Sequence, residues 1–430
     1  MRIIIKNLGP IESMEFDLSS PMTIFTGLNG TGKTYISYLI YSLYNLAATS
    51  QTNISGLQTI DSFKDFKGKL EADTIYTAYK ECLKNLQKSL TFIYNDSEDA
   101  YKDTRIEPIP FEDFKSEVYS KKFSYNITPA FFLEKDSDSF EYKLSVKEGL
   151  EKNEPQILDI INFLLLRGIL TNGNLHADMM LAERSGIYTF SKELSLNRLR
   201  LPNVIEGDDR ITRYPYPMRE ALVKAEDWAN RAKKTSPYAE LADKIEEEIV
   251  GGKVSVTDNG EIRFQGKSMD RNIPYPLASS SVKTISGLIL YLRHEAAPGN
   301  LLIIDEPETN VHPNNQVLIA RIFVKMINAG MKLLINTHSD HIIREINNMI
   351  MLSSLDKDED TAEYGYTKDE VLKKEDVAAY YFDFAKQPPY KVNVERMEIA
   401  ETGFDVKSID DTIEQLNERA SNLYYAISNK

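Results

Sequence analysis

The sequence holds 430 residues, enough for one large domain or for two to three smaller ones with a sizeable core. Its net charge of −14 and pI of about 5.1 argue against a protein that coats nucleic acid or an anionic membrane non-specifically, although a local basic groove remains open. A single cysteine, Cys82, excludes an internal disulfide and favours a cytoplasmic setting, and we expect its side chain to be buried.

The first part of the chain, residues 1–48, is expected to supply strands and one helix to an α/β core. Residues 2–6 and 14–18 predict a small antiparallel pair, and 22–26 predict a short apolar strand that runs into a glycine-rich segment. Residues 33–48 predict a helix with its apolar side chains on one side. The apolar run at the start is too short for a signal peptide.

Residues 49–180 are polar, show no catalytic constellation, and predict a largely helical insertion between two parts of one core. Residues 72–94 predict a helix and 140–146 a strand. The segment 154–170 predicts a buried helix, because polar residues interrupt it and it is shorter than the roughly 20 residues of a membrane span. No interaction with a membrane is expected.

Residues 181–265 are expected to form a second lobe. Two helices are predicted there, at 218–234 and 237–250. Strands at 253–256 and 262–265 follow, joined by an Asn-Gly turn that is typical of a hairpin.

From residue 266 to 350 the pattern alternates between helix and strand, as a parallel sheet with crossover helices requires. The predicted elements are a helix at 280–294, a strand at 301–304, a helix at 314–329 and a strand at 332–336. The tail, 351–430, is expected to complete the core or to carry a partner surface. Its predicted elements are strands at 377–384 and 390–399 and an amphipathic helix at 409–427.

The glycine-rich segment from Gly27 to Thr34 has the pattern G-x-x-x-x-G-K-T between a strand and a helix. Its glycines let successive backbone N–H groups curl around phosphate oxygens, and the helix directs its positive dipole end at the same phosphates. Lys33 is expected to reach the β- and γ-phosphates, and the Thr34 hydroxyl to coordinate Mg²⁺. The pattern therefore predicts an ATP site. The residues expected to bind the nucleotide are Asn29, Gly30, Thr31, Gly32, Lys33 and Thr34.

Two carboxylates follow the predicted strand 301–304, at the end of a strand where open α/β sheets bind their ligands. Asp305 is expected to hold Mg²⁺, and Glu306 to polarise the attacking water as general base. His338 follows the next predicted strand, where it can contact the γ-phosphate. The predicted catalytic residues are Lys33, Glu306 and His338.

Three serines, Ser279 to Ser281, open the helix that precedes Asp305. Serines at a helix start are good N-caps. The same geometry presents hydroxyls and free N–H groups to an anion, such as a γ-phosphate held by another subunit. Both interpretations remain open, and Ser279 and Ser280 are candidate nucleotide-binding residues.

These four motifs, in this order and with a long insertion between the first and the fourth, resemble the ABC-type ATPase heads of the RecF, SMC and OLD families. The resemblance covers about residues 1–48 and 270–350. Within this group the chain looks most like the bacterial OLD-like AAA ATPases, through residues 24–30, 181–187 and 305–313. Many of those proteins act in anti-phage defence. The resemblance implies an ABC-type P-loop ATPase head, in which helices flank a mixed sheet.

The resemblance also implies a head-to-head dimer with two ATP molecules at its interface. Ser279 and Ser280 of one chain would then face the nucleotide that residues 27–34 of the other chain bind. Asn310 and its neighbours would lie at the subunit boundary.

The sequence departs from the family pattern in three ways. Ser281 stands where the family usually has a glycine, so activation across the dimer is expected to be weak. The glutamine that usually contacts Mg²⁺ has no clear counterpart, and Gln58 is a candidate by position only. About 80 residues follow Ile350, too few for the TOPRIM domain of OLD nucleases, and Asp356 and Asp358 lack its surroundings. This chain is therefore not expected to be a nuclease itself.

Three functions are compatible with these motifs. The first is an ATPase switch, a homodimer or higher homo-oligomer, that controls a separate effector such as a nuclease or toxin in anti-phage defence. The second is a DNA-repair or DNA-binding ATPase of the RecF or SMC type with a basic groove. The third, a transporter subunit, is disfavoured by the insertion and by Glu306-Pro307-Glu308. Five arginines could line such a groove, although a solvated surface is the simpler account of them. They are Arg198, Arg200, Arg210, Arg213 and Arg219.

Overall fold

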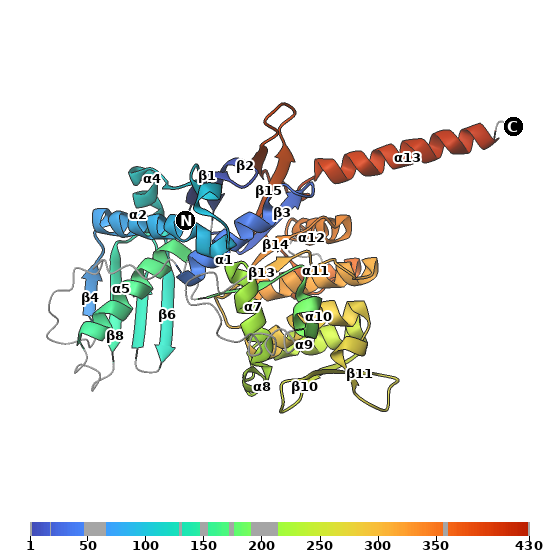
Figure 1. The fold of residues 1–430 in the computed structure, drawn as a ribbon, viewed down its shortest axis with the longest axis horizontal. Helices are drawn as coiled ribbons and strands as arrows, with labels where there is room; N and C mark the ends of the chain where they lie inside the picture. Colours follow the sequence, from blue (N-terminus) through green and yellow to red (C-terminus); the bar gives the residue numbers. More distant parts are fainter. Residues whose placement is uncertain are drawn as a thin grey trace, which may run out of the picture.

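Apolar strands from both ends of the sequence meet in one mixed β-sheet (Figure 1). The computed structural model describes residues 2–17, 19–46, 66–128, 131–146, 154–171, 176–190, 214–355 and 360–428. Within these residues the strands of the sheet are, in spatial order, β5 (Arg105–Pro108), β1 (Arg2–Leu8), β2 (Ile11–Asp17), β16 (Val392–Met397), β15 (Val377–Phe384), β3 (Met22–Gly27), β14 (Lys332–Asn336), β13 (Leu301–Asp305) and β9 (Ala177–Met180). Strands β15, β3, β14, β13 and β9 are parallel, and β1 pairs antiparallel with β2 and β5. The predicted mixed sheet flanked by helices is confirmed.

The parallel strands are buried on both faces, because alternate side chains enter two separate cores. In β13, Leu301 and Ile303 join the core that contains α1, α2 and α5. Leu302 and Ile304 join the core that contains α9, α10, α11 and α12. These helices are α1 (Lys33–Leu46), α2 (Ala72–Lys88), α5 (Glu154–Thr171), α9 (Ala239–Ile245), α10 (Ser280–His294), α11 (Pro313–Asn328) and α12 (Asp340–Leu352).

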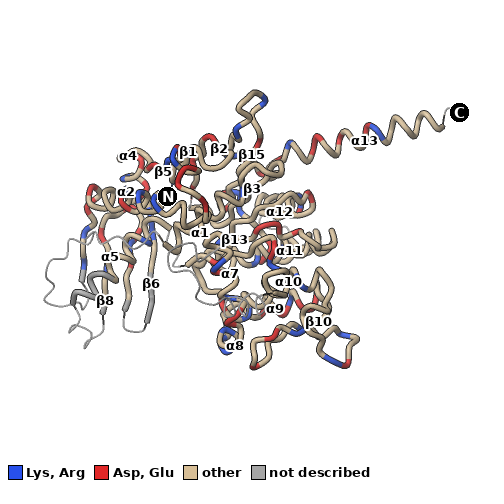
Figure 2. The backbone as a smooth tube through the Cα atoms, in the orientation of Figure 1, with Lys and Arg blue, Asp and Glu red and all other residues tan. Residues whose placement is uncertain are grey.

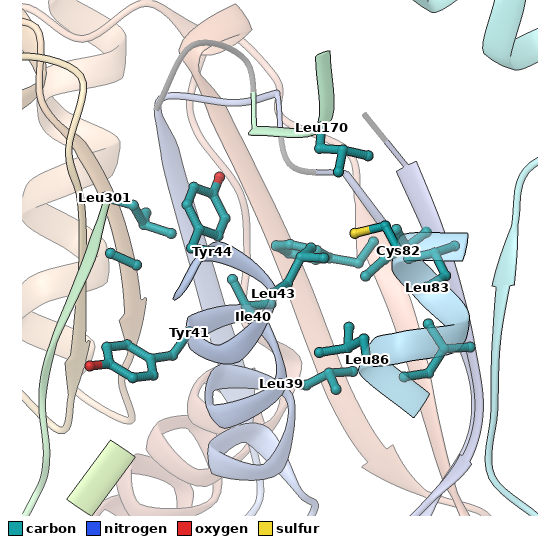
Figure 3. Close-up of a cluster of buried hydrophobic side chains, with 14 of the residues drawn as sticks. Leu39, Ile40, Tyr41, Leu43, Tyr44, Cys82, Leu83, Leu86, Leu170 and Leu301 are labelled. Carbon is teal, nitrogen blue, oxygen red and sulfur yellow. The ribbon is translucent and has the colours of Figure 1, made fainter. Parts of the chain in front are cut away.

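Helix α1 joins the sheet to the inserted segment. Its side chains Leu39 and Leu43 point toward α2, where Leu86 and Cys82 belong to the same core (Figure 3). Cys82 is buried, as predicted, and burial raises the pKa of its thiol to about 12. Helix α1, which follows the glycine-rich loop, is therefore packed both against the sheet and against α2.

Residues 66–171 carry helices, as predicted for the insertion, and also a second, antiparallel sheet. The sequence predicted only its segment 140–146, because the other strands mix polar with apolar residues. The predicted helix 72–94 is divided at Ser89 into α2 and α3. The further elements of this segment are β4 (Phe66–Lys69), α3 (Leu90–Tyr94), η1 (Glu98–Tyr101), α4 (Phe111–Ser120), β6 (Phe123–Thr128), β7 (Phe131–Lys135) and β8 (Glu141–Val146).

The second lobe has the two predicted helical regions and the predicted hairpin, with differences in detail. Asp227 divides the first region into α7 and α8. The second region continues from α9 into a π-helical turn that ends at Gly251, whose φ is 64°. Strands β10 and β11 pair antiparallel, as predicted. The elements are α7 (Tyr216–Glu226), α8 (Trp228–Arg231), η3 (Glu246–Val250), β10 (Gly252–Val256), β11 (Ile262–Gly266) and β12 (Ile273–Pro274).

The tail contributes both to the core and to the surface. Strand β15 lies between β3 and β16 in the main sheet, so this part of the tail completes the core. Helix α13 (Lys407–Ser428) extends away from the body instead (Figure 1). The tail also holds the 3₁₀ turns η5 (Thr361–Tyr364), η6 (Lys368–Glu370) and η7 (Lys374–Asp376), and a further turn, η4 (Tyr275–Leu277), precedes α10.

Some residues singled out in the sequence lie outside the described part of the chain. These are Gln58, Arg198, Arg200, Arg210, Arg213, Asp356 and Asp358. Of the helices that the structure does describe, none has the length and apolar character to cross a membrane.

Candidate nucleotide-binding site

The glycine-rich loop connects β3 to α1, which begins at Lys33 as predicted. Its glycines have positive φ: 126° at Gly27, 76° at Gly30 and 92° at Gly32, where other side chains are disfavoured. A Cβ on Gly27 would lie 2.1 Å from the carbonyl oxygen of Phe382 on β15, so strand packing requires this glycine. No described atom comes within 4 Å of a Cβ placed on Gly30, which lines the cavity described below. The loop glycines therefore serve different purposes.

Lys33 folds back onto this loop. Its Nζ donates hydrogen bonds to the carbonyl oxygens of Gly27 at 3.1 Å and Leu28 at 2.7 Å. Burial lowers the pKa of Lys33 to about 8, and the nearby carboxylates of Asp305 and Glu306 oppose this shift. Because phosphate oxygens carry full negative charge, a nucleotide in the cavity would stabilise the buried ammonium better than these carbonyl groups do.

Thr34 and Asp305 lie side by side although they are far apart in the sequence. The Thr34 hydroxyl donates to Asp305 Oδ2 at 2.9 Å, and Asn336 Nδ2 donates to Asp305 Oδ1 at 2.8 Å. Asn336 also donates to the Ser37 hydroxyl at 2.9 Å, so α1, β13 and β14 are tied together here. Burial raises the pKa of Asp305, and a bound cation would therefore stabilise its charged form.

The oxygens of Thr34 and Asp305 form a donor set that suits Mg²⁺. This ion prefers hydroxyl and carboxylate oxygens and usually keeps waters or phosphate oxygens as its remaining ligands. Within the described ranges, no three or more His, Cys, Asp or Glu side chains are grouped so that they could hold a metal ion. Two protein oxygens leave coordination positions for phosphate oxygens and water, so the site fits Mg²⁺ bound together with phosphate.

Glu306 occupies a turn directly after β13. Its φ of 47° is unusual for a residue with a side chain, and such conformations concentrate at functional sites. The turn is held from two sides: the Glu306 N–H donates to the Asn336 carbonyl at 3.0 Å, and the carboxylate accepts from the Thr309 hydroxyl at 3.0 Å. Glu306 lines the same cavity as Lys33 and Thr34. It is thus placed to accept a proton from water in that cavity.

Glu308, to which the sequence assigned no role, fixes the loop that carries His338. Its carboxylate accepts hydrogen bonds from the His338 N–H at 2.6 Å and the Thr337 hydroxyl at 2.9 Å. Burial raises the pKa of Glu308. Burial, together with nearby Lys33, lowers the pKa of His338, which favours a neutral imidazole that can both donate and accept.

One cavity of about 280 Å³ lies at the carboxyl ends of β3, β13 and β14. The sequence placed no role on three of its lining residues: Pro10 from the turn between β1 and β2, Tyr35 of α1, and the Asn336 side chain. Pro10 could not be found from its local pattern, because only the folded sheet brings that turn to the loop. The predicted residues that line the cavity are Asn29, Gly30, Thr31, Gly32, Lys33, Thr34, Asp305, Glu306 and His338.

Ser279 and Ser280 do not line this cavity in their own chain. Both are exposed at the start of α10. The Ser279 hydroxyl accepts from the Val282 N–H at 3.3 Å, which is the N-cap interaction that serines at this position predict. Asn310 is also exposed and has a φ of 59°. The contact of the serines with a nucleotide held by a second chain stays a prediction.

Arg184 is a buried side chain that the sequence analysis missed. Its guanidinium donates to the carbonyl oxygens of Asp305 at 2.8 Å and Glu306 at 3.0 Å. It also donates to the carbonyl of Thr284 in α10 at 3.1 Å, so one side chain connects the serine-bearing helix to the two acidic residues. Arg184 lies in the segment 181–187, which was one of the stretches that carried the family resemblance. That resemblance did not indicate a role for Arg184, because this side chain contacts backbone atoms of the acidic turn.

A model of the AAA ATPase domain family matches residues 1–343. No curated protein matches the chain. Among solved structures, the chain is similar to an SMC head bound to the C-winged helix domain of ScpA, at 11% identity and a TM-score of 0.36, covering 93% of this chain and 98% of that one. The SMC head domain from Thermotoga maritima is 10% identical, with coverages of 93% and 98% and a TM-score of 0.32. An Smc head with an extended coiled coil, bound to the C-terminal domain of ScpA derived from Pyrococcus furiosus, is 12% identical, with coverages of 97% and 98% and a TM-score of 0.34.

Proposed function

This chain belongs to the AAA ATPase domain family, and we propose that it binds ATP with Mg²⁺ and hydrolyses it to ADP and phosphate. The observation that carries the proposal is the 2.9 Å contact between the Thr34 hydroxyl and the Asp305 carboxylate. This contact joins the glycine-rich loop to the carboxyl end of β13. Lys33 and Glu306 border the same cavity, so phosphate-binding groups and a candidate base lie together.

The groups in and around the cavity divide the chemical tasks in this proposal. Backbone N–H groups of the loop and the Lys33 ammonium bind the phosphates. Thr34 and Asp305 would hold Mg²⁺, which supplies positive charge to the phosphate oxygens when it is bound. Glu306 accepts the proton of the attacking water, and His338 contacts the γ-phosphate. Glu308 keeps His338 in place through its backbone N–H.

Binding and hydrolysis can be tested separately on the purified chain. Nucleotide affinity is measured by titration calorimetry, and hydrolysis by phosphate release with ATP and Mg²⁺. We expect Lys33→Ala to lose ATP affinity, whereas Glu306→Gln retains affinity and loses hydrolysis. The proposal is wrong if the unaltered chain binds ATP without hydrolysing it and the Glu306→Gln variant behaves identically.

We propose further that the active form is a homodimer in which each nucleotide lies between two chains. Support comes from the exposed position of Ser279 and Ser280, which leaves their hydroxyls and the helix N-terminus accessible to a phosphate outside their own chain. To exclude contacts of the exposed helix α13, mass is measured on Glu306→Gln that also carries Leu416→Glu and Leu423→Glu, at two exposed positions of that helix. This protein should be a dimer with ATP and Mg²⁺ and a smaller species with ADP. A mass that does not respond to the nucleotide would contradict this arrangement.

ATP-driven closure of the dimer is proposed to control a separate effector protein, a nuclease or toxin, in cytoplasmic anti-phage defence. The support is the resemblance of residues 24–30, 181–187 and 305–313 to OLD-like ATPases. Cells that carry this gene with its chromosomal neighbours should resist phage, and Glu306→Gln should remove the protection. Equal phage titres with and without the intact gene set would refute the defence role.

A second candidate function, a DNA-binding ATPase of the RecF or SMC type, is favoured by one basic hollow. Lys80, Lys84 and Lys88 lie on α2 at successive turns, and with Lys102 they line a hollow of about 640 Å³ in which Glu98 is the one acidic lining residue. Lysine clusters of this kind bind phosphate backbones with strong salt dependence. An ATP-dependent, salt-sensitive shift of duplex DNA, reduced by Lys84→Glu, would favour this function. No shift at low salt would count against it.

A further inference from the structure

Helix α13 extends from the body (Figure 1), and its apolar side chains from Leu416 onward include several that are exposed. None of its 22 residues is buried. The exposed fractions are 56% for Leu416, 65% for Leu423 and 73% for Ile427. A continuous apolar stripe on a helix about 33 Å long is a costly surface to leave in water, and such surfaces usually mark interaction sites.

The stripe follows the spacing of a coiled coil. Its members are Ile409, Ile413, Leu416, Ala420, Leu423 and Ile427, whose separations alternate between four and three residues. In a heptad labelled abcdefg, Ile413, Ala420 and Ile427 take the a positions, and Leu416 and Leu423 take d positions. Isoleucine at a with leucine at d favours two parallel strands.

The root of the helix is fixed to the body. The side chain of Asn347 in α12 donates to the carbonyl of Phe404 at 2.8 Å and accepts from its N–H at 3.1 Å. Arg344 of α12 lies 3.6 Å from Asp410, and Ile409 packs against the core that contains α12. The exposed part of the stripe therefore begins at Leu416, after the partly buried Ile413, and has a defined direction relative to the body.

We propose that α13 pairs with α13 of a second copy of this chain in a parallel, two-stranded coiled coil. The flanking residues agree with this direction. A parallel pair places Arg419, at position g, beside Tyr424 of the partner subunit at position e, where a cation–π contact is available. An antiparallel pair with the apolar residues aligned would bring Arg419 against the partner's Arg419.

Charge also supports a copy of the same helix as the occupant. From Ala420 to Ser428 the helix carries no charged residue (Figure 2). Two such segments can lie together without like-charge repulsion. A strongly charged partner helix would find no complementary charges over this half of the seam.

The pairing needs no nucleotide, so it stands independently of the ATP-dependent dimer. A parallel coil holds both bodies at the same end of the paired helices, which raises the effective concentration of one body near the other. Because the helix root contacts α12, and α12 begins directly after His338 and Ser339, the coil is attached close to the nucleotide cavity. Its expected effect is to favour repeated encounters of the same two bodies.

The test is sedimentation of the full chain at micromolar concentration without nucleotide, which gives the mass of the species in solution. We expect a dimer for the unaltered chain, a monomer for the double variant Leu416→Glu with Leu423→Glu, and a dimer for Tyr425→Glu. Tyr425 is 64% exposed, nearly the same as Leu423, but lies at position f outside the seam, so it is a matched control. A monomeric unaltered chain, or a dimer that survives the double variant, overturns the proposal.

Direction is tested by oxidative cross-linking of single cysteine variants. In a parallel pair the two Leu423→Cys thiols lie opposite each other, whereas in the aligned antiparallel pair their Cα atoms are about 15 Å apart along the axis. A disulfide needs Cα atoms within about 7 Å. We expect Leu423→Cys to cross-link and Ser421→Cys, at the outer b position, to stay uncoupled. The reverse result would refute the parallel pairing. The native Cys82 is buried, so the unaltered chain serves as the background control for cross-linking.

Discussion

The nucleotide cavity and the amino end of α10 are two polar surfaces of one core, and they are built differently. At the cavity, Asp305 accepts hydrogen bonds from Thr34 of helix α1 and from Asn336 of strand β14. At α10, the exposed Ser279 accepts a hydrogen bond from Val282 of its own first turn. A surface held by distant elements is ordered before a ligand arrives. The Ser279 hydroxyl, by contrast, is bonded within its own turn, so any further task of this exposed serine depends on a ligand from outside.

The largest expected effect comes from removing the base at the ordered surface. Glu306→Gln should lower the rate of ATP hydrolysis by about 10²–10⁴-fold, because an amide cannot accept the proton of the attacking water. ATP affinity should be retained, since the phosphate-binding loop is unchanged. Single-turnover phosphate release gives the rate and calorimetry the affinity. Glu363→Gln, at an exposed acidic residue of η5, is the control and should hydrolyse ATP normally.

A bulky substitution at the second surface should separate it from the first. Ser280→Arg is expected to leave ATP affinity of the isolated chain intact but to lower hydrolysis by about 100-fold, the scale of a lost transition-state contact. The physical reason is that the arginine would obstruct a phosphate held by the other chain. Ser354→Arg, at another exposed serine, should have no such effect. Normal hydrolysis in Ser280→Arg would mean that α10 does not complete the site.

Arg184 connects the two surfaces, and a smaller effect is expected from changing it. Arg184→Lys should lower kcat by about tenfold with little change in KM, because lysine cannot contact the carbonyl groups of Asp305, Glu306 and Thr284 together. Steady-state kinetics give both constants. If KM rises while kcat stays constant, Arg184 acts on substrate binding and not on the position of the acidic turn.

Local motifs explain why the ordered surface could be predicted. The loop from Gly27 to Thr34 and the acids at the end of a buried strand are contiguous patterns, and strand ends of a parallel sheet meet at one edge. What these patterns missed depends on contacts over long distances in the sequence. Gly27 is constrained by Phe382 of β15, and Arg184 acts through the backbone of Asp305.

The secondary structure divides in the same way, into elements that local patterns predicted and elements that depend on contacts between distant parts of the sequence. Elements with a clear apolar pattern, such as α1 and β13, were predicted to within two residues of their ends. The antiparallel sheet of the insertion was largely missed, because strands such as β6 and β7 mix polar with apolar residues. The position of β15 beside β3 depends on how the whole sheet is assembled. The sequence therefore left two alternatives for the tail, completing the core or carrying a partner surface.

The smallest predicted effect lies at the opposite end of β14 from the cavity. Within the part of the chain that the structure describes, the buried Nζ of Lys332 has no hydrogen-bond partner, whereas the side chain of Asn336 at the other end is paired. Burial, with a further contribution from nearby Lys121, lowers the pKa of Lys332 from 10.5 to about 7. Lys332→Met should therefore raise the melting temperature by a few degrees.

The pH dependence of this gain distinguishes its cause. Between pH 7 and 10.5 the unfolded chain binds the Lys332 proton more tightly than the folded chain, so the unaltered protein gains stability as pH rises. The advantage of Lys332→Met should consequently be largest below pH 7 and fade toward pH 10.5. Melting curves at both ends of this window measure it, with Lys253→Met at an exposed position as the control. A gain that is constant with pH would mean that better packing, and not removal of a buried charge, is responsible.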